Sequence, residues 1–108
     1  MKIVIAKNHK KPAHSIQMKA DNTLQTLREK IDEIDQEILD LLVQRMEVAR
    51  SVGDIKKQIE MAVEDKDREQ AILNRLYGLT DDPLTRKQIK RIFTSIFHTA
   101  KDVQKTEE

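Results

Sequence analysis

Arg45 stands where the surrounding pattern would place an apolar side chain. Apolar residues recur at steps of three and four over residues 24–41, and the same steps resume over residues 48–59. This spacing predicts an amphipathic helix with Arg45 on its apolar face. Lys56 follows Arg45 by 11 residues, or three helical turns, so it points within about 20° of the same direction. Two cations are therefore predicted on one inner face.

Other polar side chains continue apolar stripes further along the chain. Glu69 precedes Ile72 by three residues and Asp65 precedes Glu69 by four, so both acids extend a helical stripe. Arg68 stands one turn before Ile72. Gln104 ends a third stripe, at a position that a purely structural helix would fill with leucine. Polar groups thus recur at the ends of apolar faces.

The polar groups on these faces have two interpretations. A guanidinium buried without a partner is costly, so an anion is expected to meet Arg45. That anion is either a carboxylate of the chain, such as Glu69, or a ligand; side chains reaching to water at a coiled-coil margin belong to the first view. The second view is a pocket for a compact anion with more than one carboxylate. Its lining would be Arg45, Lys56, Arg68 and Gln104.

The composition indicates an all-α fold. Of the 108 residues 38% are hydrophobic, 36% are charged and only four are glycine or proline, so the core must be aliphatic and helical. We predict a three-helix chain with one long N-terminal helix. The first helix is expected from Asn22 or Thr23 to about Gln58, unbroken at Gly53. The second follows in residues 65–78, and the third begins with Pro83 at its first helical position.

The predicted helix lengths indicate a homodimer. About 35 residues at roughly 1.5 Å each make a helix near 50 Å long, and its two partners are about half that length. One chain cannot cover so long an apolar stripe. A second copy related by a two-fold axis would cover it, so we expect an intertwined helical homodimer.

Residues 1–21 differ in character from the rest and are expected to be a flexible basic leader or linker, with the domain in residues 22–108. Residues 1–20 hold five lysines and no acid, but no aromatic residue to stack on a base, so no nucleic-acid partner is expected. The run "IVIA" is too short for a signal peptide or a membrane span, which favours a soluble, cytoplasmic protein. The absence of cysteine, and three histidines without ligand spacing, favour no metal and no cofactor.

Two stretches together carry a family resemblance. The segment "LREKIDEIDQEILDLLVQRMEVARSVGDIKK", followed by "DKDREQAILNRL", resembles the all-helical class of chorismate mutases over residues 24 to about 106. The resemblance implies an isomerase of aromatic amino-acid (shikimate pathway) biosynthesis that converts chorismate to prephenate by a Claisen rearrangement, in an intertwined dimer with two equivalent sites. Such a unimolecular reaction needs no nucleophile, metal or proton shuttle.

The resemblance also implies roles for individual residues. Arg45 would hold one substrate carboxylate, and Arg28 from the other chain would hold the second. Lys56 and Gln104 would face the ether oxygen. The remaining site residues would be Glu69, as acceptor for the ring hydroxyl, and Asp65 and Arg68, as supporting polar groups.

Structural alternatives stand beside three of these residues. Arg28 is also placed to pair with Asp32 or Asp35 on its own helix. Asp65 is also placed to act as an N-terminal helix charge, and Gln104 lies near a C-terminus that is free to fray. Ala100 falls where several family members carry a serine that touches a carboxylate, so that hydrogen bond is expected to be missing.

Two other functions remain open at the level of sequence. An isochorismate pyruvate lyase shares the fold and a similar cation-lined site. A non-catalytic dimerisation or regulatory module would bury Arg45 to fix helix register. Fusion to another enzyme of the aromatic pathway is a further expectation from the resemblance, although the sequence contains no second catalytic domain.

Overall fold

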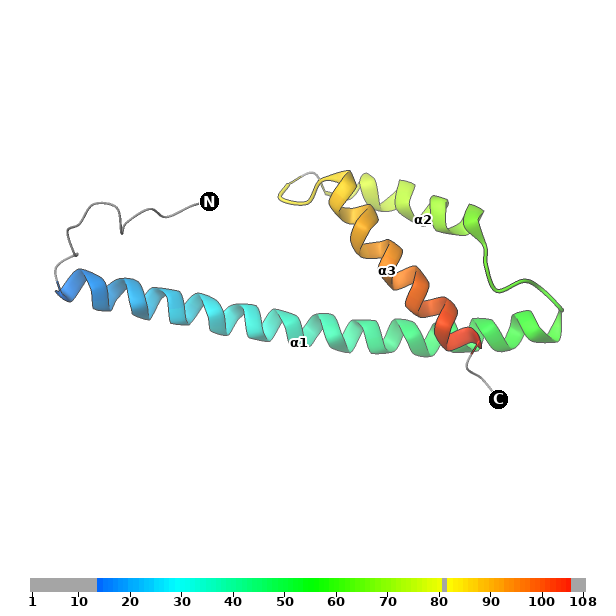
Figure 1. Ribbon diagram of the computed structural model, residues 1–108, viewed down its shortest axis with the longest axis horizontal. Helices are drawn as coiled ribbons and strands as arrows, with labels where there is room; N and C mark the ends of the chain where they lie inside the picture. The colour runs from blue at the N-terminus through cyan, green and yellow to red at the C-terminus, as the bar shows by residue number, and fades with distance from the viewer. Residues whose placement is uncertain (1–13, 81, 106–108) are drawn as a thin grey trace. The chain divides into compact units, whose positions relative to one another are not determined.

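The computed structural model describes residues 14–80 and 82–105, and its regular elements are three α-helices (Figure 1). They are α1 (His14–Gln58), α2 (Lys66–Tyr77) and α3 (Arg86–Lys105). The predicted all-α class with one long N-terminal helix is confirmed. The chain divides into two units between Asp40 and Leu41, so that α1 contributes to both. Each unit is described by itself below.

Helix α1 begins earlier than the sequence predicts. It starts at His14, so the predicted N-cap at Asn22 or Thr23 is wrong. Residues 15–21 contain no glycine or proline, and most are good helix formers. Thr26 Oγ1 donates to the Asn22 carbonyl at 3.0 Å, so Asn22 lies within a continuous helix. Residues 1–13 lie outside the described residues, and the division into leader and domain stays a prediction.

The end of α1 is set by backbone geometry after Gly53. The helix continues through Gly53, as predicted, and stops at Gln58. The Met61 N–H donates to the Lys56 carbonyl at 2.7 Å, and the Glu60 N–H donates to the Lys57 carbonyl at 3.2 Å. Glu60 has a φ of 57°, which completes the Schellman arrangement that ends many helices.

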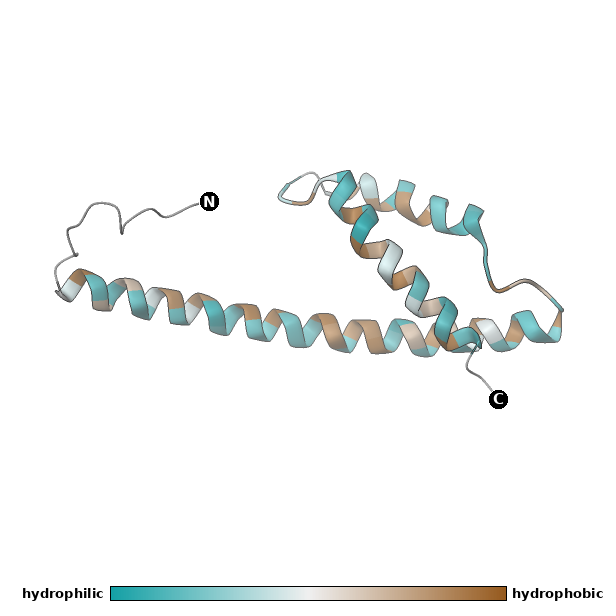
Figure 2. Cartoon of the chain, in the orientation of Figure 1, coloured by the Kyte–Doolittle hydropathy of each residue, from teal (hydrophilic) through white to brown (hydrophobic). Residues whose placement is uncertain are grey.

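The first unit exposes the apolar residues of its part of α1. Every residue from 15 to 40 is exposed, and hydrophobic residues recur along the helix ribbon (Figure 2). The large apolar residues of this half are 45–60% exposed: Ile16, Met18, Leu24, Leu27, Ile31, Ile34, Ile38 and Leu39. That one chain leaves this stripe uncovered stays a prediction. The homodimer itself stays a proposal.

Helix α2, in the second unit, begins and ends at capping residues. Asp65 is the N-cap, and its carboxylate accepts the Arg68 N–H at 2.9 Å. Gly78 is the C-cap, with its N–H donating to the Arg75 carbonyl at 3.2 Å. Both ends agree with the sequence prediction. No helix in the part of the chain that the structure describes combines the length and apolarity needed to cross a membrane.

Helix α3 begins later than predicted. It starts at Arg86, so Pro83 precedes the helix and the prediction of Pro83 at its first position is wrong. The reason is a capping box. The Thr85 N–H donates to Gln88 Oε1 at 3.0 Å, and the Gln88 N–H donates to Thr85 Oγ1 at 3.2 Å. This reciprocal pair fixes the helix start two residues beyond Leu84.

The core of the second unit joins α2 to α3. Ile72, Leu73 and Phe97 are buried together at 5–8% exposure, with half-buried Phe93 against them. The Phe93 and Phe97 rings tilt by 56° at a centroid distance of 6.2 Å. Full burial of such a side chain contributes about 1.5–3 kcal/mol. Ile72 and Phe97 also face a cavity, so the same packing positions the polar groups that line it.

Candidate active site

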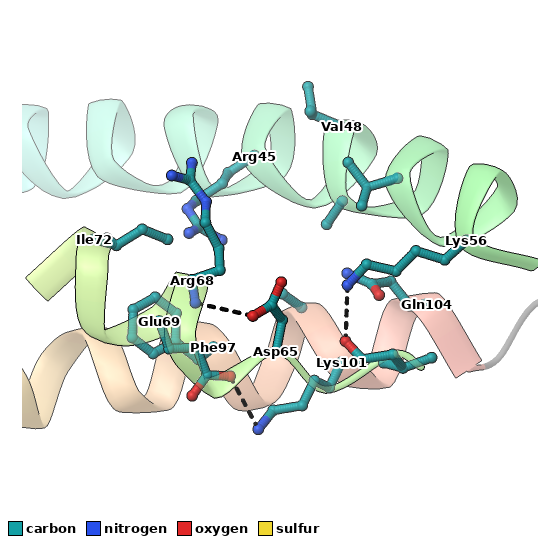
Figure 3. Close-up of a pocket in the computed structure, with 14 residues that line it drawn as sticks. Arg45, Val48, Lys56, Asp65, Arg68, Glu69, Ile72, Phe97, Lys101 and Gln104 are labelled. Carbon is teal, nitrogen blue, oxygen red and sulfur yellow. Dashed lines mark hydrogen bonds and ion pairs between the residues drawn. The ribbon is translucent and has the colours of Figure 1, made fainter. Parts of the chain in front are cut away.

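A cavity of about 310 Å³ opens in the second unit among the last turns of α1, the start of α2 and the end of α3 (Figure 3). Its volume falls at the small end of the range for small-molecule sites. Much of the lining is apolar. These side chains are Val48, Ala49, Val52, Val63, Ile72, Phe97 and Ala100.

The polar lining carries an excess of positive charge. Four cationic side chains and two carboxylates line the cavity, which leaves two positive charges over. They are half-buried, except for Arg68, which is exposed. Such a concave, partly apolar surface favours a doubly negative ligand of small size. The charged residues are Arg45, Lys56, Arg68, Lys101, Asp65 and Glu69.

The Arg45 guanidinium lies over the Phe97 ring, 5.8 Å from its centroid. Burial, and then the positive charge of Arg68, lower the pKa of Arg45 from its ordinary value. In Figure 3 the Arg45 and Arg68 side chains converge on the same end of the cavity. Glu69 forms its ion pair with Lys101, rather than the pair with Arg45 that one interpretation of the sequence foresaw. Two neighbouring guanidinium groups favour an anion that contacts both.

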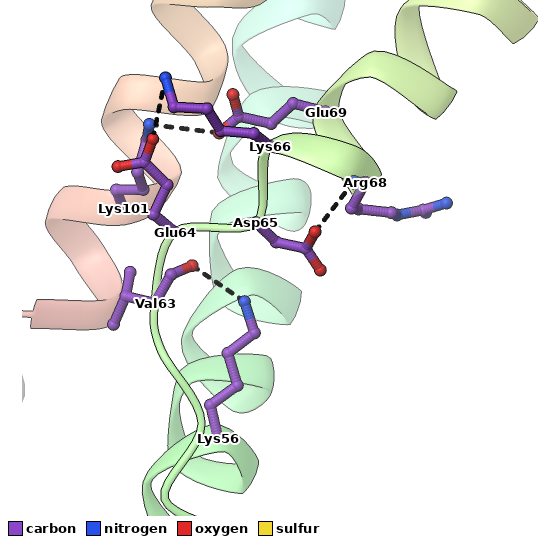
Figure 4. A network of polar contacts seen from close by, with 8 residues as sticks. All are labelled: Lys56, Val63, Glu64, Asp65, Lys66, Arg68, Glu69 and Lys101. Carbon is purple, nitrogen blue, oxygen red and sulfur yellow. Dashed lines mark hydrogen bonds and ion pairs between the residues drawn. The ribbon is translucent and has the colours of Figure 1, made fainter.

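Lys56 is held by the connection between α1 and α2. Its Nζ donates to the Val63 carbonyl at 2.9 Å (Figure 4). An ammonium group has three N–H donors, so this bond leaves two for a ligand. The carbonyl therefore fixes the direction of Lys56 and leaves its charge available to the cavity.

Asp65 caps a helix and also lies in the wall of the cavity. It caps α2, as the alternative interpretation held, and its half-buried carboxylate also lines the cavity. Because the cap bonds the backbone of Arg68, it fixes the first turn of α2, which carries Arg68 and Glu69.

Gln104 is positioned by a close contact with α1. A Cβ at Gly53 would lie 2.8 Å from Gln104 Cγ and 2.9 Å from its Cβ, so only glycine allows this approach. Gln104 Oε1 is buried and has no hydrogen-bond partner among the described residues. An unsatisfied buried polar group costs about 1–3 kcal/mol. A ligand that donates a hydrogen bond to Oε1 would remove that cost.

The structure brings six of the seven predicted site residues to one cavity: Arg45, Lys56, Asp65, Arg68, Glu69 and Gln104. Arg28 is exposed on α1 in the first unit and is not part of this lining. Ala100 lines the cavity with a methyl group, which offers no hydrogen bond.

Sequence reasoning missed Lys101 and the Val63 carbonyl. Lys101 follows Phe97 by four residues, so the helical step that identified the apolar face of α3 was a signal for it. The Val63 carbonyl had no such signal, because main-chain acceptors in a loop depend on the loop's conformation.

Residues 27–105 match the family described as chorismate mutase type II. The chain belongs to this family. The predicted resemblance is confirmed, and with it the assignment to an isomerase of the chorismate mutase type.

Individual chorismate mutases show the same likeness. The chain is 35% identical to the chorismate mutase of Methanocaldococcus jannaschii over 83 residues, which cover 76% of this chain and 84% of that protein. It is 44% identical over 62 residues to the bifunctional chorismate mutase/prephenate dehydratase of Escherichia coli, covering 57% of this chain but only 16% of that longer protein.

Two solved structures share the fold. A chorismate mutase from Helicobacter pylori in complex with prephenate has a TM-score of 0.75 and 32% identity, covering 79% of this chain and 92% of that one. A chorismate mutase from Thermus thermophilus has a TM-score of 0.77 and 26% identity, covering 80% and 98%.

Proposed function

We propose that this member of the chorismate mutase family converts chorismate to prephenate in the cavity of its second unit. The observation that supports the proposal most strongly is the excess of two positive charges in a small, partly apolar cavity. Chorismate carries two carboxylates, so its charge complements that excess. The reaction breaks the ether C–O bond while a C–C bond forms within the same molecule. It needs positioning and electrostatic stabilisation rather than a nucleophile.

Arg45 and Arg28 hold the two carboxylates in this proposal. Arg45 acts from α1 within the cavity, and Arg28 is supplied by a second copy of the chain. A planar guanidinium binds a carboxylate through two parallel hydrogen bonds, which fixes both position and orientation. Holding both ends selects the folded conformer of the substrate, in which the carbons that must bond are close.

Lys56 and Gln104 stabilise the charge that develops on the ether oxygen as its bond breaks. Lys56 is directed by the Val63 carbonyl and Gln104 by its contact with Gly53. Donors fixed in advance need little reorganisation during the reaction, and each is worth about 10²–10³ in rate. Rotation of the Gln104 amide by half a turn exchanges Oε1 and Nε2, so the side chain can present its N–H to the oxygen.

Glu69 accepts the hydrogen bond of the ring hydroxyl, and Asp65 and Arg68 support it from the first turn of α2. The Asp65 cap fixes this turn. Arg68 also adds positive charge beside Arg45, which strengthens binding of the dianion.

A homodimer completes the site in this proposal. The exposed apolar stripe of α1 needs a partner surface, and an identical stripe related by a two-fold axis provides one. Arg28 lies between Leu27 and Ile31 of that stripe. A second copy that covers the stripe can therefore carry Arg28 to a neighbouring cavity.

The direct test gives the full chain chorismate and, separately, isochorismate, and follows prephenate and pyruvate. We expect prephenate from chorismate and no pyruvate from isochorismate. Pyruvate from isochorismate without prephenate from chorismate would identify a lyase instead. A chain that turns over neither substrate, and whose melting temperature does not rise with prephenate, would be a non-catalytic module.

A further inference from the structure

Lys101 counts toward the positive charge of the cavity, but the proposed function gives it no individual role. It lies on α3, and its side chain is only 17% exposed. Its Nζ is 3.2 Å from Oε2 of Glu69, whose side chain is 25% exposed. An ion pair this far removed from water is less screened than one on the surface, and loss of one member leaves the other charge poorly solvated.

We propose that Lys101 is a positioning residue that orients the Glu69 carboxylate toward the substrate hydroxyl, an inference that rests on the proposed function. The pair occupies Oε2 of Glu69 and leaves Oε1 for the substrate. A free glutamate has several rotatable bonds and would have to be ordered on binding. Fixing it beforehand removes that entropic cost from the binding step.

Lys101 has a second effect, because its charge offsets that of Glu69. Glu69 contributes a negative charge to a cavity that receives a dianion, and the two repel each other. Lys101 offsets that charge where it arises. Without it, three cations would face two carboxylates, and the excess would fall to one. Glu69 can therefore accept a hydrogen bond from the hydroxyl while its charge repels the dianionic substrate less strongly.

The neighbouring charges leave Lys101 available for its ion pair with Glu69. Glu64 is another acid near it, and its pKa is lowered first by the hydrogen bond from Lys66 and then by the charge of Lys101. The Lys66 Nζ lies 3.1 Å from Glu64 Oε2 (Figure 4). Glu64 thus has its own cation, while the close ion pair of Lys101 is with Glu69.

A double-mutant cycle on chorismate turnover tests this inference. Lys101→Met keeps a long side chain but removes the charge, and we expect kcat/KM to fall about tenfold. Lys101→Arg restores the ion pair and should recover most of that loss. In a Glu69→Gln background, where the carboxylate is absent, Lys101→Met should change kcat/KM by less than about twofold. A purely structural Lys101 would cost the same factor in both backgrounds.

The matched control is Lys105→Met, one turn further along α3. Lys105 is exposed and does not line the cavity, so its loss should leave kcat/KM within about twofold of the original. Circular dichroism checks folding, and Lys101→Gln replaces the methionine variant if that variant does not fold. Equal losses in both Glu69 backgrounds, or no loss in the single variant, would overturn the inference. If the unaltered chain makes no prephenate, the proposed function fails and the inference falls with it.

Discussion

The two halves of α1 share the same spacing of apolar residues but have different surfaces. In residues 15–40 the stripe consists of apolar side chains that are about half exposed, and the charged residues around it are exposed as well. In the second unit Arg45 interrupts the same apolar spacing, Lys56 points in nearly the same direction, and both of them line a cavity. One helix therefore carries a surface suited to another apolar surface and a surface suited to an anion.

An interruption of an apolar pattern therefore gives information about function that the pattern itself does not give. An uninterrupted stripe is satisfied by any matching apolar surface, so it predicts a partner without specifying chemistry. A cation within the stripe needs an anion at a defined place, so it predicts a site. Arg45 met both Phe97 and a second guanidinium in the structure, and neither neutralises it. In the proposed site this charge meets a carboxylate of the ligand.

The largest effect on activity is expected when the cavity loses the hydrogen-bond donor Lys56. Lys56→Ala should lower kcat/KM by about 10²–10³, or roughly 3–4 kcal/mol, because charge on the ether oxygen loses a prearranged partner. Steady-state kinetics on chorismate measure it. Lys66→Ala is the control, since the Lys66 side chain is 82% exposed and its ion pair is with exposed Glu64. An unchanged kcat/KM for Lys56→Ala would remove Lys56 from the mechanism.

The next effect concerns the uninterrupted stripe. Ile34→Glu places a charge in the middle of it, and we expect the dimer to dissociate and activity at low protein concentration to fall about a hundredfold, since each site loses Arg28 of the second copy. Gln36→Glu introduces the same side chain on the opposite face and should change neither property. Sedimentation and kinetics over a range of protein concentrations measure both. An Ile34→Glu variant that stays dimeric would argue against the stripe as the interface.

A smaller effect is expected at the contact that positions Gln104. Gly53→Ala forces a methyl group against Gln104, which should cost about 1–3 kcal/mol of stability. We expect kcat to fall about tenfold, because the amide is displaced from the ether oxygen. At Gly78 an added Cβ would meet only the Arg75 carbonyl at 3.6 Å, so Gly78→Ala should keep full activity. Equal kcat for the two variants would show that the Gly53 contact does not position Gln104.

Much of the fold could be predicted from the sequence, because long stretches of the sequence have regular apolar spacing. The passage of α1 through Gly53 and the ends of α2 at Asp65 and Gly78 followed from spacing and capping chemistry. The start of α1 did not, because Asn22 and Thr23 look like capping residues yet lie within a continuous helix. Local capping preference is weak beside the gain from extending an existing helix.

The residues of the site could be predicted from the sequence as far as the helix faces that carry them could be predicted. Arg45 and Lys56 came from one periodic count, and the structure brings them to one cavity. The Glu69–Lys101 pair joins two helices, so it depends on their relative register, which no count along one helix supplies. The sequence also contains the capping box of Thr85 and Gln88, which fixes the start of α3 beyond Pro83.

Mixing two inactive variants tests most directly the claim that the apolar half of α1 delivers Arg28 to the cavity of a second copy. Arg28→Ala and Arg45→Ala should each lose at least about a hundredfold in activity alone. After subunit exchange, half of the dimers would be mixed, and each would hold one intact site. Activity should then recover to about a quarter of that of the unaltered chain. A mixture no more active than the separate variants would contradict a site shared between two copies.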